Sequence, residues 1–157
     1  IGTLELNSKF KKWDPGYQYY NSSSLMNYPG YDYQGLRRVK YDSWSTSTVV
    51  YSSNGIELKS EVCAKRASGN LYWKDSPCYY MSLTGNSISD IYSLGNLMLY
   101  KDQHRMNTKT EYNNVTSQCT IYGWSGIILD TKSIRGDYIF KLNSNSSILS
   151  FFYQWND

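Results

Sequence analysis

The chain has 157 residues, of which 17% are aromatic and only 18% are charged, and its formal net charge is +3. This length fits one core, so we expect residues 1–157 to form a single domain. No run approaches the ~18 apolar residues of a membrane span, and the cations form no dense basic tract. We therefore expect neither membrane insertion nor nucleic-acid binding.

The aromatic residues are mainly tyrosine, with 17 Tyr against 5 Trp. A Tyr ring packs on one face and keeps its hydroxyl for water or a partner, and Tyr is also a good strand former. This composition favours β-structure with polar, ligand-contacting surfaces. The chain begins at Ile1 without an initiator Met or an apolar leader, which leads us to expect a secreted or cell-surface protein whose signal peptide has been removed.

The first half of the chain contains one irregular segment and one hairpin pattern. Prolines, glycines and tyrosines between Trp13 and Tyr33 indicate a loop or an irregular edge strand. Between Ser43 and Ala64, apolar and β-branched residues alternate with polar ones on both sides of Asn54-Gly55. Asn-Gly suits a type I′ turn, so we predict a β-hairpin that turns there. Trp44 in its first strand is expected to point inward and anchor the sheet.

The remaining elements are expected to be short strands separated by Gly, Asn and Ser. They cover 71–73 after a turn at 68–70, 117–130 with breaks at Gly123 and Gly126, 138–142, and 148–155 after a turn at 143–147. Residues 89–100 could form a short helix, but Gly95 argues against it. Many short strands with turns about ten residues apart predict an all-β fold, an elongated immunoglobulin-like or jelly-roll-like β-sandwich.

The three cysteines have no Cys-x-x-Cys spacing and, with a single His, do not make a zinc site. One disulfide is the simpler interpretation. Cys63 could pair with Cys78 or with Cys119, and the third thiol would be buried or would reach a region outside this chain.

Catalytic signatures are lacking in the sequence. The lone His104 lies in a polar run and is expected to be exposed. Glu57 and Glu61 lie four residues apart on one expected strand, which separates them by about 13 Å, more than the ~5–9.5 Å of glycosidase carboxylate pairs. They are expected to lie on a solvated face. We predict that the protein is not an enzyme and uses no metal and no cofactor.

Carbohydrate recognition requires flat aromatic faces beside amides, carboxylates or cations that bind sugar hydroxyls. Two runs combine these features and supply the predicted ligand-binding residues, which are Tyr72, Trp73, Lys74 and Asp75 in one run and Tyr122 and Trp124 in the other. Trp73 is the preferred platform, because the polar residues after it indicate a strand end at the surface. The sequence thus predicts a surface that binds sugars.

The segment from Ile127 to Tyr138, with the apolar run 127–129 and Gly136-Asp137-Tyr138, resembles the end of the N-terminal receptor-binding domain of chaperone-usher fimbrial tip adhesins of the P-pilus group. The resemblance implies a lectin domain on an elongated immunoglobulin-like sandwich at a fimbrial tip. Its partners would be a host glycan, on a glycolipid or a glycoprotein, and pilin subunits reached through a C-terminal domain that is missing here.

The alternative is a protein-receptor-binding head domain of a viral or other surface glycoprotein. In such a protein the sequons at Asn21, Asn114 and Asn145 would be glycan acceptors. Their number is close to what chance gives in a chain so rich in Asn, Ser and Thr. The sequons therefore do not separate the two hypotheses.

Overall fold

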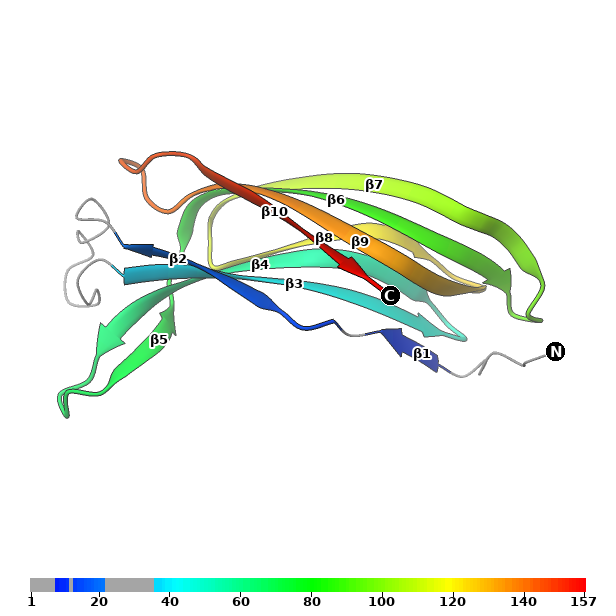
Figure 1. Cartoon of the computed structure of the whole chain (residues 1–157), viewed down its shortest axis with the longest axis horizontal. Coiled ribbons are helices and arrows are strands. Elements are labelled where there is room, and N and C mark those ends of the chain that lie inside the picture. Colours follow the sequence, from blue (N-terminus) through cyan, green and yellow to red (C-terminus); the bar gives the residue numbers. More distant parts are fainter. Residues whose placement is uncertain (1–7, 12, 22–35) are drawn as a thin grey trace.

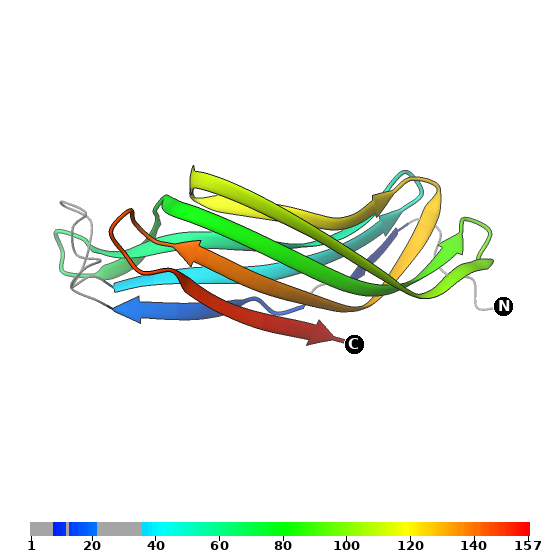
Figure 2. The same ribbon diagram turned by 90° about the horizontal axis from the view of Figure 1, so that it is seen from above.

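The protein forms an elongated sandwich of two antiparallel β-sheets in a computed structural model that describes residues 8–11, 13–21 and 36–157 (Figures 1 and 2). Its strands are β1 (Ser8–Lys11), β2 (Gly16–Asn21), β3 (Leu36–Thr48), β4 (Ser52–Lys65), β5 (Leu71–Asp75), β6 (Cys78–Ser93), β7 (Met98–Asn114), β8 (Thr116–Trp124), β9 (Ile127–Lys141) and β10 (Leu149–Asn156). The predicted all-β sandwich is confirmed. The described residues contain no helix with the length and apolarity that a bilayer crossing requires.

Each sheet is built around two long central strands. In the first sheet β3 pairs with β4, while β1 and β2 pair with the two ends of β3, and β8 and β5 with the two ends of β4. The second sheet has the order β10-β9-β6-β7. The chain crosses between the sheets after β5, β7 and β8, so both sheets share one interior.

The main core lies between the sheets and follows the two-residue period of the strands. Val39 and Tyr41 on β3 and Leu58 on β4 face Leu83 and Phe140 of the second sheet, and all five are buried. The predicted alternation of 138–142 is confirmed, because every second residue from position 138 onward is buried.

Aromatic rings close one long edge of the sandwich. The Tyr41 ring lies between 5.0 and 6.1 Å from the rings of Phe151, Trp155 and Tyr138, and Tyr138 stacks on Phe151 at 4.7 Å. These contacts join β3 of the first sheet to β9 and β10 of the second. Much of the chain's aromatic content is therefore used in packing.

Away from the main core, the sheets are joined by a buried hydroxyl network made of Ser45, Ser47, Ser52, Asn54, Ser89 and Thr131. The Asn54 amide donates to Ser89 Oγ at 3.3 Å and to Thr131 Oγ1 at 3.0 Å, and Ser45 Oγ donates to Thr131 Oγ1 at 2.8 Å. Each of these bonds links a residue of the first sheet to one of the second.

The network continues into the backbone of β9. Ser47 and Ser52 share a hydrogen bond of 2.6 Å. Ser52 Oγ donates to the carbonyl of Ile127 at 2.8 Å, and the Leu129 amide donates to Ser47 Oγ at 2.9 Å. Beyond the network lies a small apolar cluster of Ile91, Ile127 and Leu129. The hydroxyl network thus separates this cluster from the main core.

The predicted hairpin exists as β3 and β4, but its turn is not at Asn54-Gly55. The chain turns at residues 49–51, where the Thr48 amide donates to the Tyr51 carbonyl at 3.1 Å and Thr48 Oγ1 accepts from the amides of Val50 and Tyr51. Asn54 is buried in the hydroxyl network, and next to it lies an irregularity in the pairing of β4 with β8. Asn54 therefore serves interior packing, and Thr48 stabilises the turn.

Trp44 also differs from its prediction. It is half-buried on the outer face of the first sheet, where its indole nitrogen donates to Ser53 Oγ at 3.1 Å and its ring lies over Gly55. Alternation along β3 explains the error, because Ser43 and Ser45 take the inward positions on either side of it. Hydroxyls, and not the indole, face the interior there.

The other predicted elements match in part, and β6 and β7, the two longest strands, were not predicted. The turn at 68–70 is confirmed, with Gly69 at a φ of 92°. Strands β8 and β10 begin and end close to their predicted limits, and the break between Gly123 and Gly126 is the turn between β8 and β9. The segments 127–130 and 138–142 were expected as separate short pieces, but they are the two ends of one strand, β9. Residues 89–100 are not helical, since they form the end of β6, a turn at 94–97 and the start of β7. Of the segment 13–33, residues 16–21 form β2 and residues 22–33 lie outside the described residues.

The predicted disulfide is wrong, because all three cysteines are buried free thiols. Cys63 shares a face of the first sheet with Arg38 and Glu61, whereas Cys78 and Cys119 lie in the main core. Cys119 is also the register partner of Ile56, seven residues from Cys63 along β4, or about 23 Å. Cys63 and Cys78 therefore lie on opposite sides of the first sheet, and the separation of Cys63 from Cys119 exceeds the short Cα distance of a disulfide.

Gly55 allows us to test the tight packing of the Trp44 ring on the outer face of the first sheet. A β-carbon there would lie 2.2 Å from the Trp44 ring and 2.4 Å from the Cys119 carbonyl oxygen. We expect Gly55→Ala to lower the free energy of unfolding by about 2–3 kcal/mol. Gly95→Ala is the matched control, since the nearest atom there is 3.7 Å away. Equal urea midpoints for the two variants would contradict this packing.

The thiols give a second test. Burial raises the pKa of Cys63, Cys78 and Cys119 and also shields them, so we expect slow reaction of the native protein with a thiol reagent at pH 8. The unreduced protein unfolded in urea should release three equivalents of thiol. A count of one would show that a disulfide forms and that this part of the structure is wrong.

Candidate functional site

The two predicted ligand-binding runs lie at opposite ends of the sandwich. Trp73 is the register partner of Cys63, and Trp124 is the register partner of Ser52, eleven residues away along β4. At about 3.3 Å per residue this separates them by about 36 Å. They therefore cannot contribute to one site, and each must be judged on its own surroundings.

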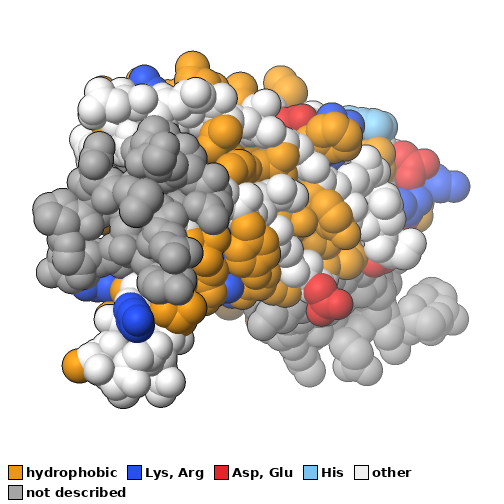
Figure 3. Space-filling view, turned by 60° about the vertical axis from the view of Figure 1, so that its left-hand side comes forward, with side chains coloured by type: hydrophobic (Ala, Val, Ile, Leu, Met, Phe, Trp, Pro, Cys, Tyr) orange, Lys and Arg blue, Asp and Glu red, His pale blue; other side chains and the backbone are white. Residues whose placement is uncertain are grey.

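Exposed aromatic surface alone does not identify a site in this protein. On the face shown in Figure 3, hydrophobic side chains reach the surface in several bands between polar atoms. Surface aromatics are also distributed over many strands. A binding site must therefore be recognised by a concave shape, by rings with free faces, and by polar groups that point to the same space.

The run around Trp73 forms β5, and its rings are already in use. The Arg38 guanidinium lies 4.2 Å from the centre of the Trp73 ring and 4.3 Å from that of Tyr17, while Tyr19 contacts the Trp73 ring edge-on at 5.8 Å. Arg38 is held in turn by Glu61, whose carboxylate accepts from Arg38 Nε at 2.9 Å. The Trp73 ring thus forms part of a closed surface cluster.

The neighbours of Trp73 do not join it. Tyr72 and Lys74 point to the opposite face of the strand, as alternation requires, and Tyr72 lies beneath the Arg66 guanidinium at 4.1 Å. Asp75 pairs with Lys59 at 3.1 Å. The four residues predicted as one site are therefore split between two faces.

The run around Trp124 borders a groove between β7 and β8 with a volume of about 380 Å³. We call it the Trp124 groove. Ile91 and Ile127 belong to the small apolar cluster that also supports the Tyr122 ring. Tyr100 and Trp124 complete the lining, together with Leu99 and Arg105. Both predicted residues of this run, Tyr122 and Trp124, thus line one concave surface.

The rings of the Trp124 groove have free faces. Trp124 is 62% exposed and Tyr100 57% exposed, and in the described part of the chain neither stacks on another ring or on a cation. Only Tyr122 is engaged, because the Arg105 guanidinium lies over its ring at 4.9 Å. The groove therefore offers two open aromatic faces on either side of one positioned cation.

Arg105 has no carboxylate partner among the described residues. The charged groups nearby satisfy each other, since Lys132 binds Asp102 at 2.6 Å and Asp90 at 3.3 Å. The hydrogen bond to Lys132 lowers the pKa of Asp102, and the same bond raises the pKa of Lys132, so both stay charged at neutral pH. The donors of Arg105 are thus left for a ligand.

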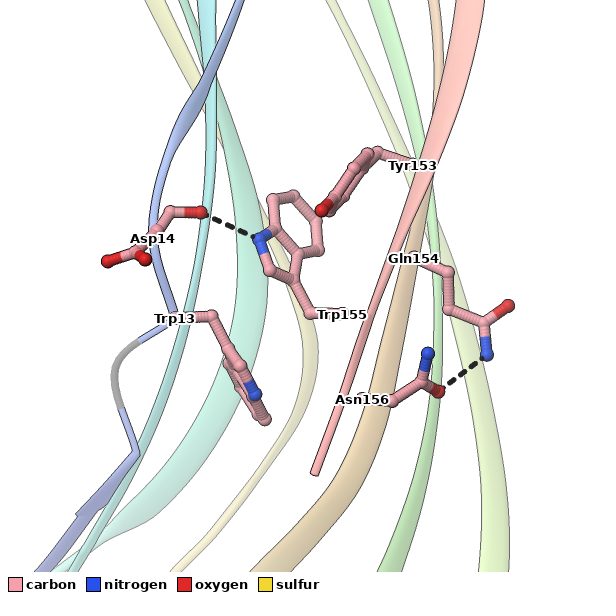
Figure 4. Close-up of a pocket in the computed structure, with 6 residues that line it drawn as sticks. All are labelled: Trp13, Asp14, Tyr153, Gln154, Trp155 and Asn156. Carbon is pink, nitrogen blue, oxygen red and sulfur yellow. Dashed lines mark hydrogen bonds between the residues drawn. The ribbon is translucent and has the colours of Figure 1, made fainter.

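A second cavity, which the sequence did not predict, lies between the segment before β2 and strand β10 (Figure 4). Its volume is about 340 Å³, and the rings of Trp13 and Trp155 face it from the two sides. Trp155 donates its indole hydrogen to the Asp14 carbonyl at 3.0 Å. The Asp14 carboxylate points away, and the amide of Gln154 lies on the other side of β10. Its polar groups do not converge on the rings.

The residues considered for catalysis are scattered. His104 is exposed on β7, as predicted. Glu61 is buried against Arg38, which corrects the expectation of a solvated face, while Glu57 accepts a hydrogen bond from Gln118. Among residues 8–11, 13–21 and 36–157, no group of three His, Cys, Asp or Glu side chains could hold a metal ion.

The sequence reasoning missed Tyr100, Arg105 and Leu99. They lie on β7, which pairs with β6 in the second sheet, whereas Tyr122 and Trp124 lie on β8 in the first sheet. The groove therefore combines residues from two different sheets. Strand alternation predicts the face of a residue but not which strand lies opposite it. The one available signal was the apolar run from Leu97 to Tyr100 directly after a turn.

No protein-family model matches the chain, and no curated protein or solved structure is significantly similar to it. The function therefore has to be argued from the geometry of the Trp124 groove itself.

Proposed function

We propose that the protein is a carbohydrate-binding protein and that the Trp124 groove is its binding site. The observation that supports this most is the pair of open rings, Trp124 and Tyr100, beside the unpaired donors of Arg105. Sugars present an apolar C–H face and a rim of hydroxyls, so they match a flat ring next to a hydrogen-bond donor.

The groove is also positioned firmly enough for recognition. Tyr122 packs on the small apolar cluster, and Ile127 of that cluster is tied to Ser52 of the hydroxyl network. Arg105 is held over Tyr122, so its planar donors are oriented before a ligand arrives. Such pre-organisation lowers the entropy lost on binding.

Attachment to a host-cell glycan, as the resemblance to fimbrial tip adhesins implies, stays a prediction, as do the secreted or surface location and the absence of catalysis. A protein receptor is the competing partner. The composition of the groove favours a sugar, because two exposed aromatic rings flank Arg105, which has no carboxylate partner in the described part of the chain.

The test compares the sugar affinity and the stability of two variants, Trp124→Ala and Trp73→Ala. An array of defined oligosaccharides first identifies the best ligand, and calorimetry then measures its affinity for Trp124→Ala and Trp73→Ala. We expect Trp124→Ala to bind about tenfold or more weakly, because a free stacking face is lost. Its melting temperature should not change, since the ring is exposed.

Trp73→Ala is the matched control. It should bind with unchanged affinity but unfold more easily, by about 1–2 kcal/mol, because Arg38 and Tyr19 lose their ring contacts. Normal binding by Trp124→Ala would move the site elsewhere. An array without any binding oligosaccharide, combined with saturable binding to a cell-surface protein, would favour the protein-receptor alternative.

A further inference from the structure

Two hairpin turns at one end of the sandwich expose aliphatic side chains. Val50 on the β3–β4 turn is 73% exposed, and Leu97 on the β6–β7 turn is 68% exposed. Val49, Leu94 and Met98 on the same turns are also exposed. We call these five residues the apolar tip.

The two turns lie at the same end of the molecule. Figures 1 and 2 both show them opposite the end that carries β5, with the β6–β7 turn extending furthest. The β8–β9 turn is next to them, because Ser52 directly after the first turn pairs with Trp124, and Trp124 and Leu99 line one groove. The aliphatic residues therefore lie on two separate turns at the same end of the long axis.

Charge is absent from the chain segments that form the three turns at this end. No Asp, Glu, Lys or Arg occurs in residues 43–56, 91–100 or 112–129. The flanking charges are register partners further along the strands, Asp42 with Glu57 and Asp90 with Asp130. Strand β1, which carries lysines, pairs with β3 beside this end. The apolar tip itself thus carries no charge, and the nearest charged positions lie along the strands behind it and on β1.

The backbone of both turns is satisfied internally. In the first turn Thr48 binds the backbone of residues 50 and 51. In the second, the Ser93 amide donates to the Leu97 carbonyl at 2.7 Å, and Ser93 Oγ accepts from the Leu97 amide at 3.1 Å. Unsatisfied peptide groups make entry into hydrocarbon costly, and these turns have bonded many of theirs already.

We propose that the apolar tip docks on a lipid bilayer and places its aliphatic side chains at the boundary between head groups and acyl chains. A rigid protein partner would need a matching concave surface for two separate convex turns, whereas a fluid bilayer adapts to them. The order of side chains also fits, since aliphatic residues lie outermost and Tyr51, Tyr100 and Trp124 lie behind them, where interfacial aromatic residues occur.

Docking of this kind needs no spanning segment, and it does not rest on sugar binding. It would hold the Trp124 groove at the level of the lipid head groups, where the sugars of glycolipids are found. Aliphatic burial drives the contact, so a zwitterionic bilayer is sufficient.

The test is co-sedimentation of the full chain with phosphatidylcholine vesicles that contain no glycolipid. Val50→Asp and Leu97→Asp are each expected to lower the partition coefficient about tenfold or more, because a carboxylate replaces an inserted side chain. Ile148→Asp is the matched control, since Ile148 is 67% exposed on the β9–β10 turn at the other end. It should change partitioning less than twofold.

Binding should persist in 0.5 M salt, because the apolar tip carries no charge. If an Asp variant fails to fold, the milder variants Val50→Ser and Leu97→Ser replace it. Each should still lower the partition coefficient more than Ile148→Ser does. No sedimentation of the wild type, its loss in high salt, or an equal effect of Ile148→Asp would overturn the proposal. Sugar affinity measured without vesicles decides the function of the groove separately.

Discussion

The hydroxyl network between the two sheets is the constraint on which the functional end of this protein depends. A sandwich interior is usually filled by aliphatic and aromatic side chains, as it is here around Leu58 and Phe140. Toward the tip, serine, threonine and asparagine take the inward positions instead. Buried polar groups are costly unless they are paired, and here they pair with each other across the interior. The spacing of the two sheets at this end is therefore determined by hydrogen-bond lengths.

This arrangement explains why the tip has its own small core. Ile91, Ile127 and Leu129 cannot merge with the main core, because the hydroxyl network lies between them. A buried hydroxyl pair contributes about 1 kcal/mol net, less than the ~1.5–3 kcal/mol of a buried aliphatic side chain. The tip therefore depends more on hydrogen bonds than on burial of apolar surface, and these include the ladder between β6 and β9, whose register shifts between Ile88 and Ser89.

The fold was largely predictable from the sequence, whereas the site was only half predictable. Alternation and turn residues predicted the hairpin of β3 and β4, and β5, β8 and β10, because both signals are local. They did not predict β6 and β7, the two longest strands, for which no strand was assigned from the sequence. Asn54-Gly55 was misread because Asn-Gly has a strong local preference for turns, yet here the Asn54 amide meets partners 35 and 77 residues away. The predictions of an inward Trp44 and of a disulfide at Cys63 were wrong for the same reason, because the face that a strand residue takes depends on which neighbours fill the core.

Trp73 and Trp124 show why exposure must be weighed together with neighbours. Both lie beside polar residues in the sequence, and both reach the surface. Arg38 comes from β3 and Tyr19 from β2, so the sequence around Trp73 contains no sign that its ring is occupied. Arg105 is likewise 19 residues from Trp124 and reaches the groove only because β7 and β8 face each other. Whether a ring is free to bind is thus a property of the tertiary structure. In this aromatic-rich chain, Arg38 covers the Trp73 ring, whereas no cation among the described residues covers the Trp124 ring. A ligand can therefore stack on Trp124 but not on the covered face of Trp73.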